Sequence, residues 1–362
     1  MALKLTGTMH TYEWGHEELI AGLQGRTPSG QPEAELWFGA HPSAPALTSE
    51  GPLDEVIERE SGKQLPFLVK LLAAKRPLSL QAHPSLEQAR EGFARENAAG
   101  IPLDAPHRNY KDDNHKPELL IALTPFRAIA GFQPIERTLT LLRTFDLPQL
   151  AELERTLDDA SLNTADRLAR ALKLALTVDA AEAVAQRAAE LAAGDSECKG
   201  TAANLAFIAR EYPGDNGVVA ALLLNHVSLE PGEALFLAAG NLHAYLCGMG
   251  VEVMANSNNV LRGGMTSKHI DSDELFSVLK FVTLDNPTAQ LVDGSFNVPV
   301  DDFSVSPTSG GEPVAGPAIV INTAGELAVG DVRLGPGEAS WVGAHEGCVP
   351  VEGVAAAGFV VR

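Results

Sequence analysis

The sequence predicts a mainly β protein in which an α-helical domain interrupts a β scaffold and a second β domain follows. Residues 1–84 carry short apolar stretches punctuated by Gly, Pro and Ser, which suit strands and turns. Residues 134–213 are rich in Ala, Leu, Arg and Glu at the helical period. From about residue 286 the pattern is short strands and Gly turns without helices, which favours a second β-barrel or sandwich.

The remaining segments complete this division. Residues 85–100 switch to helical spacing, with Ser85 as the N-cap and Gly100 at the end of a short helix. Strand-like runs return in HKPELLIALTPFRAIAGF and in VSLEPGEALFLAAGNLHAYL, where PGE makes a tight turn. We therefore expect a discontinuous first domain at 1–133 and 214–285, a helical inserted domain at 134–213, and a C-terminal β domain at 286–362.

Composition narrows the class of protein. The 362-residue chain has a net charge of −20, which argues against nucleic acid or an anionic membrane as a partner. Its three cysteines form no CxxC pair, so we expect neither a disulfide framework nor a cysteine zinc site, and a reducing cytoplasm fits. The first thirty residues lack the pattern of a secretion signal, and no segment has eighteen uninterrupted apolar residues. We expect a soluble cytoplasmic protein, and nothing in the sequence demands more than a monomer.

Two imidazoles, a carboxylate and an amide form a candidate metal site. Gln81 and His83 lie two residues apart in SLQAHP, so they share one face if the segment is a strand. Glu118 follows in NHKPELL, and His243 opens a new strand in GNLHAYL. Zinc accepts such N and O ligands and keeps open positions in catalytic sites. Spacing alone does not bring three distant segments together, and a lone histidine in an apolar segment is more often a satisfied buried residue than a ligand.

Charged residues near these segments are candidates for catalysis. Lys116 would share a strand face with Glu118, or would instead pair with Asp112 or Asp113. Glu252 stands between two valines and either faces solvent or points into a pocket, and alternation does not decide between them.

A glycine pair in NVLRGGMTSKH indicates a candidate anion-binding segment. Arg262 stands directly before Gly263 and Gly264, where a guanidinium fork can bind a phosphate and glycine leaves room for backbone contacts. Lys268 follows in the same segment. The alternative is an arginine on a solvated turn. Because the chain is strongly acidic, an anionic substrate requires such basic residues to be concentrated at the site.

Six motifs, taken in order, resemble the type I mannose-6-phosphate isomerase family. They are YEWG at 12–15, ELWFGAHP at 35–42, FLVKLLAAKRPLSLQAHP at 67–84, NHKPEL at 114–119, GNLHAYL at 240–246 and VEVMANSNNVLRGGMTSKHID at 251–271. One motif alone would be suggestive, whereas six in the family's order across most of the first 280 residues are highly specific.

This resemblance implies a fold, a cofactor and an activity. The implied fold is a cupin-type architecture of β jelly rolls with an inserted α-helical domain. The implied activity interconverts mannose 6-phosphate and fructose 6-phosphate through an enediolate, which feeds activated-mannose (GDP-mannose) synthesis or mannose catabolism. One zinc ion per chain would be held by four residues: Gln81, His83, Glu118 and His243. Further active-site residues would be Trp14, Lys116, Glu252, Arg262 and Lys268.

The resemblance also suggests roles for these side chains. Lys116 would help to open the sugar ring or stabilise the enediolate. Glu252 would transfer the proton between C2 and C1, or would support the metal from outside its ligand shell. Arg262 would stabilise the enediolate or bind the phosphate, with Lys268 adding to the phosphate pocket and Trp14 to substrate binding.

Two motifs of the chain differ from the family pattern. The chain has Asn258 in SNNV, and Met265 with Ser267 in MTSKH, where relatives commonly have SDNV and LTPKH. Asn258 removes a possible carboxylate.

A sugar-phosphate sensor without turnover is disfavoured because the ligand set, Lys116 and Arg262 occur together. A metal-dependent cupin oxygenase is disfavoured because the amide of Gln81 suits zinc better than iron.

Overall fold

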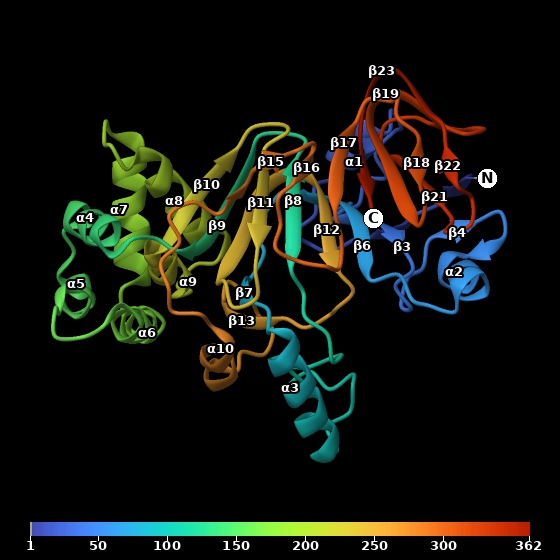
Figure 1. Ribbon diagram of the computed structural model, residues 1–362. Coiled ribbons are helices and arrows are strands. Elements are labelled where there is room, and N and C mark those ends of the chain that lie inside the picture. Colours follow the sequence, from blue (N-terminus) through green and yellow to red (C-terminus); the bar gives the residue numbers. More distant parts are fainter. Residues whose placement is uncertain (1) are drawn as a thin grey trace.

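Two large β-sheets and a group of helices stand side by side in the molecule (Figure 1). The computed structural model describes residues 2–362. Helices from the middle of the chain form one end, an 11-stranded sheet occupies the centre, and a 6-stranded sheet stands at the other end, near both chain termini. The architecture is mainly β, as the sequence predicts.

The central sheet consists of two groups of strands that share one long strand, β12 (His243–Ala255). One group runs in the order β14, β11, β8, β12, β6, β3, β2, and the other joins β10, β9, β7 and β13 to the same strand. The other strands are β2 (Thr8–His10), β3 (Glu35–Gly39), β6 (Phe67–Ala74), β7 (Leu80–Ala82), β8 (Glu118–Ala122), β9 (Phe126–Phe132), β10 (Leu224–Leu229), β11 (Ala234–Leu237), β13 (Leu261–Gly264) and β14 (Thr288–Ala289).

A glycine marks the point where β12 changes partners. Its first residues pair with β7 and β9, and it pairs with β6 from Gly248 onward and with β8 from Gly250 onward. Gly248, the first residue of the second set, has a φ of 121°, and a Cβ there would lie 2.7 Å from the carbonyl oxygen of Pro125. Only glycine fits this backbone conformation and this close approach. One strand thereby belongs to both groups.

Strand β6 separates two apolar layers. All eight of its residues are buried, which explains why FLVKLLAA is nearly continuously apolar. Val69 and Leu71 belong to a core shared with Trp341 of the C-terminal sheet, whereas Leu72 and Ala74 belong to a separate cluster on the other face. The C-terminal sheet therefore packs on one face of the central sheet, and the second face is left for the site.

The helices between β9 and β10 cover the strand group that contains β7 and β9. Buried residues of these helices, such as Leu139 and Leu172, share one core with Leu80, Ile129 and Ala244 of the strands. Residues 134–213 are largely helical, as predicted, and the helical region continues to Leu223. The elements are α4 (Ile135–Phe145), η1 (Pro148–Leu150), α5 (Ala151–Asp158), α6 (Thr164–Ala175), α7 (Ala181–Ala193), α8 (Lys199–Glu211), α9 (Gly217–Ala220) and η2 (Ala221–Leu223).

The 6-stranded sheet joins the two ends of the chain. Strand β1 pairs with β21, so the first residues complete a sheet whose other strands come from the C-terminal segment. Its strands are β1 (Ala2–Leu5), β17 (Val305–Thr308), β19 (Ala318–Val329), β20 (Val332–Leu334), β21 (Glu338–Val342) and β23 (Val351–Val361). Short two-stranded pairs are β4 (Leu47–Thr48) with β5 (Gly51–Pro52), β15 (Leu291–Val292) with β16 (Ser295–Phe296), and β18 (Val314–Ala315) with β22 (Cys348–Val349).

Three details differ from the sequence prediction. Strands β19 and β23 have 12 and 11 residues, so the C-terminal strands are not all short. Helices α1 (Leu19–Leu23) and α2 (Leu53–Ser61) lie in the segment predicted as strands and turns, and α10 (Ser272–Val278) was also not predicted. Each missed helix has at most nine residues. Such a length spans too few turns for the helical period to stand out from the surrounding Gly and Pro.

Helix α3 (Leu86–Ala98) begins as predicted and projects from the sheets (Figure 1). The Ser85 hydroxyl accepts the backbone N–H of Gln88 at 3.2 Å, and the Gln88 side-chain oxygen accepts the backbone N–H of Ser85 at 2.9 Å. This capping box satisfies two donors that the first helical turn leaves unpaired. Gln88 also connects α3 to α10, because its side-chain amide donates to the carbonyl oxygen of Ser277 at 3.0 Å.

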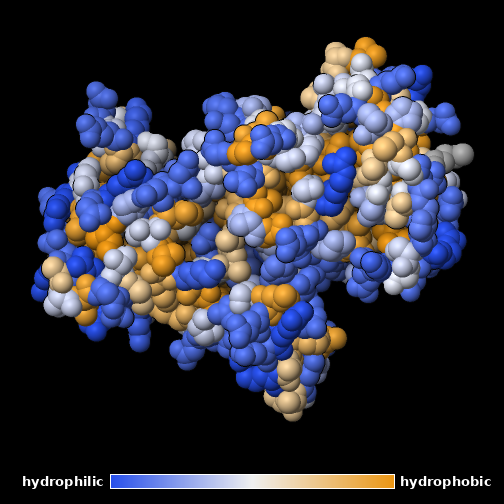
Figure 2. All heavy atoms as spheres, in the orientation of Figure 1, coloured by the Kyte–Doolittle hydropathy of each residue, from blue (hydrophilic) through white to orange (hydrophobic). Residues whose placement is uncertain are grey.

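The surface shows no single continuous apolar area on the visible face. Hydrophilic residues cover much of it, and hydrophobic residues gather in separate patches over the helical end and the centre (Figure 2). None of the helices in residues 2–362 combines the length and the apolar character that crossing a bilayer requires.

Replacing Ser85 with Ala should destabilise α3 by about 1 kcal/mol, because the N-cap acceptor is lost. Hydrogen exchange of the α3 amides measures this local opening. Ser85→Asp keeps an acceptor at the same position and should retain most of the protection, and equal exchange in both variants would contradict the role of the cap.

Candidate active site

Three adjacent strands bring predicted site residues into one row. Strand β7 lies between β12 and β13, so Gln81 has His243 and Arg262 as its cross-strand partners. Directly opposed residues of antiparallel strands have Cβ atoms about 4.5–5.5 Å apart. The sheet register therefore places an amide, an imidazole and a guanidinium next to one another.

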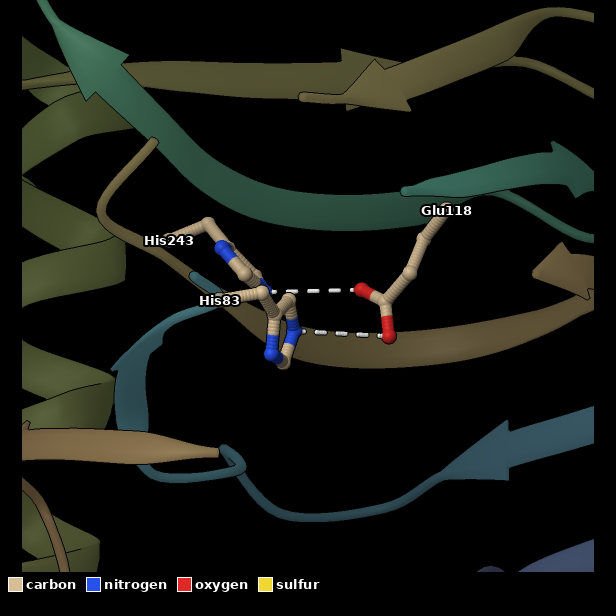
Figure 3. Close-up of side chains that lie close together, drawn as sticks. All are labelled: His83, Glu118 and His243. Atoms are coloured by element: carbon tan, nitrogen blue, oxygen red, sulfur yellow. Dashed lines mark ion pairs between the residues drawn. The ribbon is translucent and has the colours of Figure 1, made fainter. Parts of the chain in front are cut away.

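His83, Glu118 and His243 form a buried metal-binding group (Figure 3). Their candidate ligand atoms all lie within 4.8 Å of one another. Nε2 of His83 lies 3.5 Å from one oxygen of Glu118, and Nε2 of His243 lies 3.5 Å from the other. Ligands about 2.1 Å from a tetrahedral metal are roughly 3.4 Å from one another, so this spacing fits a small transition-metal ion.

Both imidazoles direct the lone pair of Nε2 toward Glu118. Nδ1 of His83 lies 2.7 Å from the carbonyl oxygen of Asn259, and Nδ1 of His243 lies 2.9 Å from that of Asn241. Because a carbonyl oxygen only accepts, each Nδ1 carries the hydrogen and donates it. Nε2 is therefore the free ligand atom of each ring.

His83 and Glu118 present buried acceptor atoms to one another. Burial lowers the pKa of His83 to about 4, so this ring is neutral near pH 7 and forms no true ion pair with Glu118. Nε2 of His83 and one oxygen of Glu118 are buried without a hydrogen-bond partner within residues 2–362. Unpaired buried acceptors are costly, and a cation bound between them would satisfy both. The donor set thus fits a metal ion.

Gln81 adjoins this group from β7. Its amide nitrogen lies 3.4 Å from Nε2 of His243, and the hydroxyl of Ser79 lies 3.4 Å from its amide oxygen. The oxygen and nitrogen of an amide exchange places by a 180° rotation, which here would turn the oxygen toward the imidazoles. Gln81 can therefore offer an oxygen ligand to the same ion.

Lys116 contacts the group through Glu118. Its Nζ lies 2.9 Å from a carboxylate oxygen of Glu118. Burial alone would raise the pKa of Glu118, but the Lys116 ammonium holds it well below its usual range. The two side chains thus lie on one side, although β8 begins only at Glu118. Asp112, a partner considered for Lys116, instead accepts the hydroxyl of Ser257 and the backbone N–H of Asn258, each at 2.7 Å.

A buried charge network adjoins the group and was not predicted. Lys70 on β6 stands opposite Glu252 on β12, with Nζ 2.9 Å from a carboxylate oxygen of Glu252 and 3.7 Å from one of Glu35. Glu35 also accepts the indole N–H of Trp37 at 2.7 Å. Burial alone would lower the pKa of Lys70, but the carboxylates of Glu252 and Glu35 raise it. Burial raises the pKa of Glu252, which the Lys70 ammonium opposes. The sequence signal was a lysine inside the apolar run FLVKLLAA.

Gln81 and Arg262 line a cleft of about 540 Å³. Trp14 and Lys268, which were also predicted as site residues, line the same cleft. Lys116 and Glu252 are not among its lining residues and are 9% and 2% exposed. The structure thus separates the predicted side chains into a cleft set and a buried set.

The cleft contains two cations without an acidic partner. Arg76 also lines the cleft but lies 3.6 Å from Glu211. Arg262 and Lys268 have no carboxylate within ion-pair distance among residues 2–362. Burial lowers the pKa of Arg262, and partial burial followed by the charge of Arg262 lowers that of Lys268. An anionic substrate would meet these two unpaired cations, although the cleft lining as a whole, with Glu13, Glu211 and Asp215 beside the three basic residues, carries no net formal charge.

Asn258, which departs from the family pattern, lies outside the metal-binding group. Its amide nitrogen is 3.1 Å from Nε2 of His41, and its backbone N–H donates to Asp112. The side chain is exposed, so an amide here is tolerated without leaving a buried group unpaired.

Comparison with known proteins decides the family. The family model "Phosphomannose isomerase type I, catalytic domain" matches residues 2–135. Mannose-6-phosphate isomerase of Escherichia coli (strain K12) is 38% identical over 384 residues, which covers 97% of each chain. The corresponding protein of Salmonella typhimurium is 38% identical over 383 residues, again 97% of each chain. The chain belongs to the type I phosphomannose isomerase family. The resemblance carried by the six motifs is confirmed.

A solved structure extends the family match to the whole fold. Mannose 6-phosphate isomerase from Salmonella typhimurium, bound to substrate (f6p) and a zinc atom, has a TM-score of 0.86 and 36% identity, covering 99% of this chain and 98% of that chain. Beyond residues 2–135, the likeness to phosphomannose isomerases therefore includes the helices and the C-terminal sheet.

Replacing His243 with Ala should release bound metal, because one of two imidazole ligands is removed from the group. Elemental analysis of the purified variant measures the loss. The matched control is His226→Ala, since His226 lies on β10 outside the group. Full metal content in the His243 variant would contradict the ligand assignment.

Proposed function

We propose that this phosphomannose isomerase family member is a zinc-dependent aldose-ketose isomerase that interconverts mannose 6-phosphate and fructose 6-phosphate. The observation that carries the proposal is the register of β7, which sets Gln81 between His243 and Arg262. Gln81 thus connects the buried metal-binding group to a cleft that Arg262 lines, where Arg262 has no carboxylate partner among residues 2–362. The name shared by relatives at 38% identity, and the zinc and substrate in the Salmonella structure, support the same activity.

Four residues would hold one zinc ion per chain: Gln81, His83, Glu118 and His243. Nε2 of both histidines is free because each Nδ1 donates to a backbone carbonyl. When bound, zinc would polarise the sugar carbonyl and stabilise developing negative charge on oxygen. The Lys116 ammonium favours the ionised form of Glu118 through one carboxylate oxygen and leaves the other oxygen without a hydrogen-bond partner within residues 2–362, available to the ion.

The substrate would bind through the cleft residues Arg262, Lys268 and Trp14. Arg262 and Lys268 supply charge for the phosphate or for the enediolate, since neither is neutralised by a carboxylate among residues 2–362. Trp14 is half-buried and packs beside the apolar cluster that contains Tyr245, which leaves an aromatic surface on the cleft wall. Aromatic rings offer an apolar face to the C–H side of a sugar.

Lys116 and Glu252 would move the protons. The isomerisation takes a proton from C2 of the aldose and returns one to C1, while a proton passes between the oxygens of C1 and C2. Glu252 would accept and return the carbon-bound proton, and its burial favours this because a raised pKa suits a general base. Lys116 Nζ would donate to the ring oxygen during opening or to the enediolate oxygen. A supporting role for Glu252, through its pair with Lys70, is the alternative.

We also propose the finer architecture and cellular role. The first domain, 1–133 with 214–285, and the C-terminal domain, 286–362, would be cupin-type jelly rolls, and 134–213 would be the inserted helical domain. Antiparallel pairing throughout both large sheets supports this. The protein would act as a cytoplasmic monomer and serve GDP-mannose synthesis or mannose catabolism.

A coupled assay with mannose 6-phosphate tests the function directly. The purified protein should form fructose 6-phosphate, lose this activity after chelation, and recover it when zinc is returned, because the bound ion would supply the charge that stabilises the developing oxyanion. Activity that persists after metal removal, verified by elemental analysis, would overturn the zinc mechanism. Absence of turnover in zinc-loaded protein would instead favour a sensor or another sugar phosphate.

Replacing Arg262 with Ala should lower kcat by about 100-fold, the usual cost of removing a charge-stabilising donor from an active site. Arg143→Ala is the matched control, because Arg143 is paired with Glu154 at 2.7 Å and does not line the cleft. Steady-state kinetics on mannose 6-phosphate distinguishes the two variants. Equal rates in both would remove Arg262 from the chemistry.

A further inference from the structure

Asp215 connects the helical segment to the segment that carries Arg262 and Lys268. It lies in the turn between α8 and α9 and lines the cleft. One carboxylate oxygen accepts the backbone N–H of Gly217 at 2.6 Å, and the other accepts the backbone N–H of Met265 at 2.8 Å. A single side chain thus bridges two turns that are 50 residues apart in sequence.

The turn at Met265 needs such support. Gly264 has a φ of 152° and Met265 a φ of 56°, so two consecutive residues adopt conformations that L side chains avoid. A non-glycine residue in this conformation is strained, and it persists only when its surroundings hold it. The hydrogen bond from Met265 to Asp215 and the burial of the Met265 side chain, 1% exposed, provide this restraint.

The two turns approach so closely that they act as one unit. A Cβ on Gly217 would lie 2.8 Å from Cγ of Met265, and a Cβ on Gly264 would lie 2.9 Å from a carboxylate oxygen of Asp215. Both positions therefore require glycine. A displacement of either turn must move the other.

The helical side of this contact is itself anchored to the opposite wall of the cleft. The Tyr212 hydroxyl donates to the carbonyl oxygen of Pro77 at 2.7 Å, close to the start of β7. Glu211 pairs with Arg76 at 3.6 Å, and the Asn216 amide donates to the carbonyl of Leu176 at the end of α6 at 3.1 Å. Residues 211–217 thus connect the segment before β7 to the segment after β13.

From these contacts we propose that Asp215 is a positioning residue of the active site. It holds the turn that follows β13, so that Arg262, three residues before Met265, and Lys268, three residues after it, face the same cleft. The inference rests on the proposed isomerase function for its kinetic consequence. Both carboxylate oxygens are occupied by backbone N–H groups, so Asp215 acts through the turn and takes no part in proton transfer. The helical segment then contributes to catalysis by fixing the cleft wall.

Asp215→Ala tests the contact and its consequence separately. Hydrogen exchange in peptides that cover Met265 should become at least tenfold faster, since the acceptor for that amide is gone. The value of kcat/KM for mannose 6-phosphate should fall by about 100-fold, the scale expected when catalytic groups are misplaced by about 1 Å. Zinc content should stay at the wild-type level, because no ligand is touched. Asp215→Asn keeps one oxygen acceptor and should lie between wild type and Asp215→Ala in both measurements.

The control variant is Asp159→Ala. Asp159 also accepts a backbone N–H in a turn of the helical segment, from Ser161 at 2.9 Å, but it does not line the cleft. The variant Asp159→Ala should leave both kcat/KM and hydrogen exchange at Met265 unchanged.

Each outcome decides one part of the proposal. Unchanged exchange at Met265 in Asp215→Ala would overturn the contact. Faster exchange with unchanged kcat/KM would overturn its role in positioning, and loss of thermal stability alone would show a purely structural residue. If Asp215→Ala does not fold, Asp215→Asn supplies the same comparison. Exchange can be measured without turnover, so failure of the isomerase assay in wild type would refute the function and still leave the contact tested.

Discussion

The antiparallel pairing of β12 with four other strands determines where the functional side chains lie. His243 at its start is opposite Gln81, and Glu252 nine residues later is opposite Lys70. The same strand pairs with β8, which begins at Glu118. Because side chains alternate between faces, a slip of one residue in this register would reverse the facing of Glu252 and separate it from Lys70. The change of partners at Gly248 is what allows one strand to serve both groups.

The site is built on strands, whereas its cleft wall is built on turns. Strand pairing fixes the metal-binding group, and buried hydrogen bonds from Nδ1 to backbone carbonyls fix the rings. Arg262 lies on β13, but the pairing of β13 with β7 becomes irregular at a bulge directly after this residue. The following turn depends on contacts with residues 211–217. This explains how the helices between β9 and β10, which supply none of the three residues of the metal-binding group, are structurally coupled to the cleft.

The sequence predicted the parts that depend on local pattern. Helices over 134–213 were predicted because their period persists through many turns, and the cap at Ser85 because its partner is three residues away. The pairing of β1 with β21 depends on contacts between opposite ends of the chain, which no local pattern contains. The shared face of Gln81 and His83 could be argued from spacing, but their meeting with Glu118 and His243 was expected only from the family resemblance. Lys70 was missed because its partner, Glu252, is defined by strand register alone.

The buried charges explain how a strongly acidic chain can attract an anion. Two lysines, Lys70 and Lys116, face three glutamates, Glu35, Glu118 and Glu252, in contacts of 2.9 to 3.7 Å. At their ordinary charges these five groups carry one excess negative charge, which a divalent cation would reverse to one excess positive charge. Exposed acidic groups more than about 8 Å away are largely screened by physiological salt. The field at the cleft is therefore set by nearby groups: this cluster with the ion it would hold, the basic residues Arg262 and Lys268, and the acidic residues that also line the cleft, Glu13, Glu211 and Asp215.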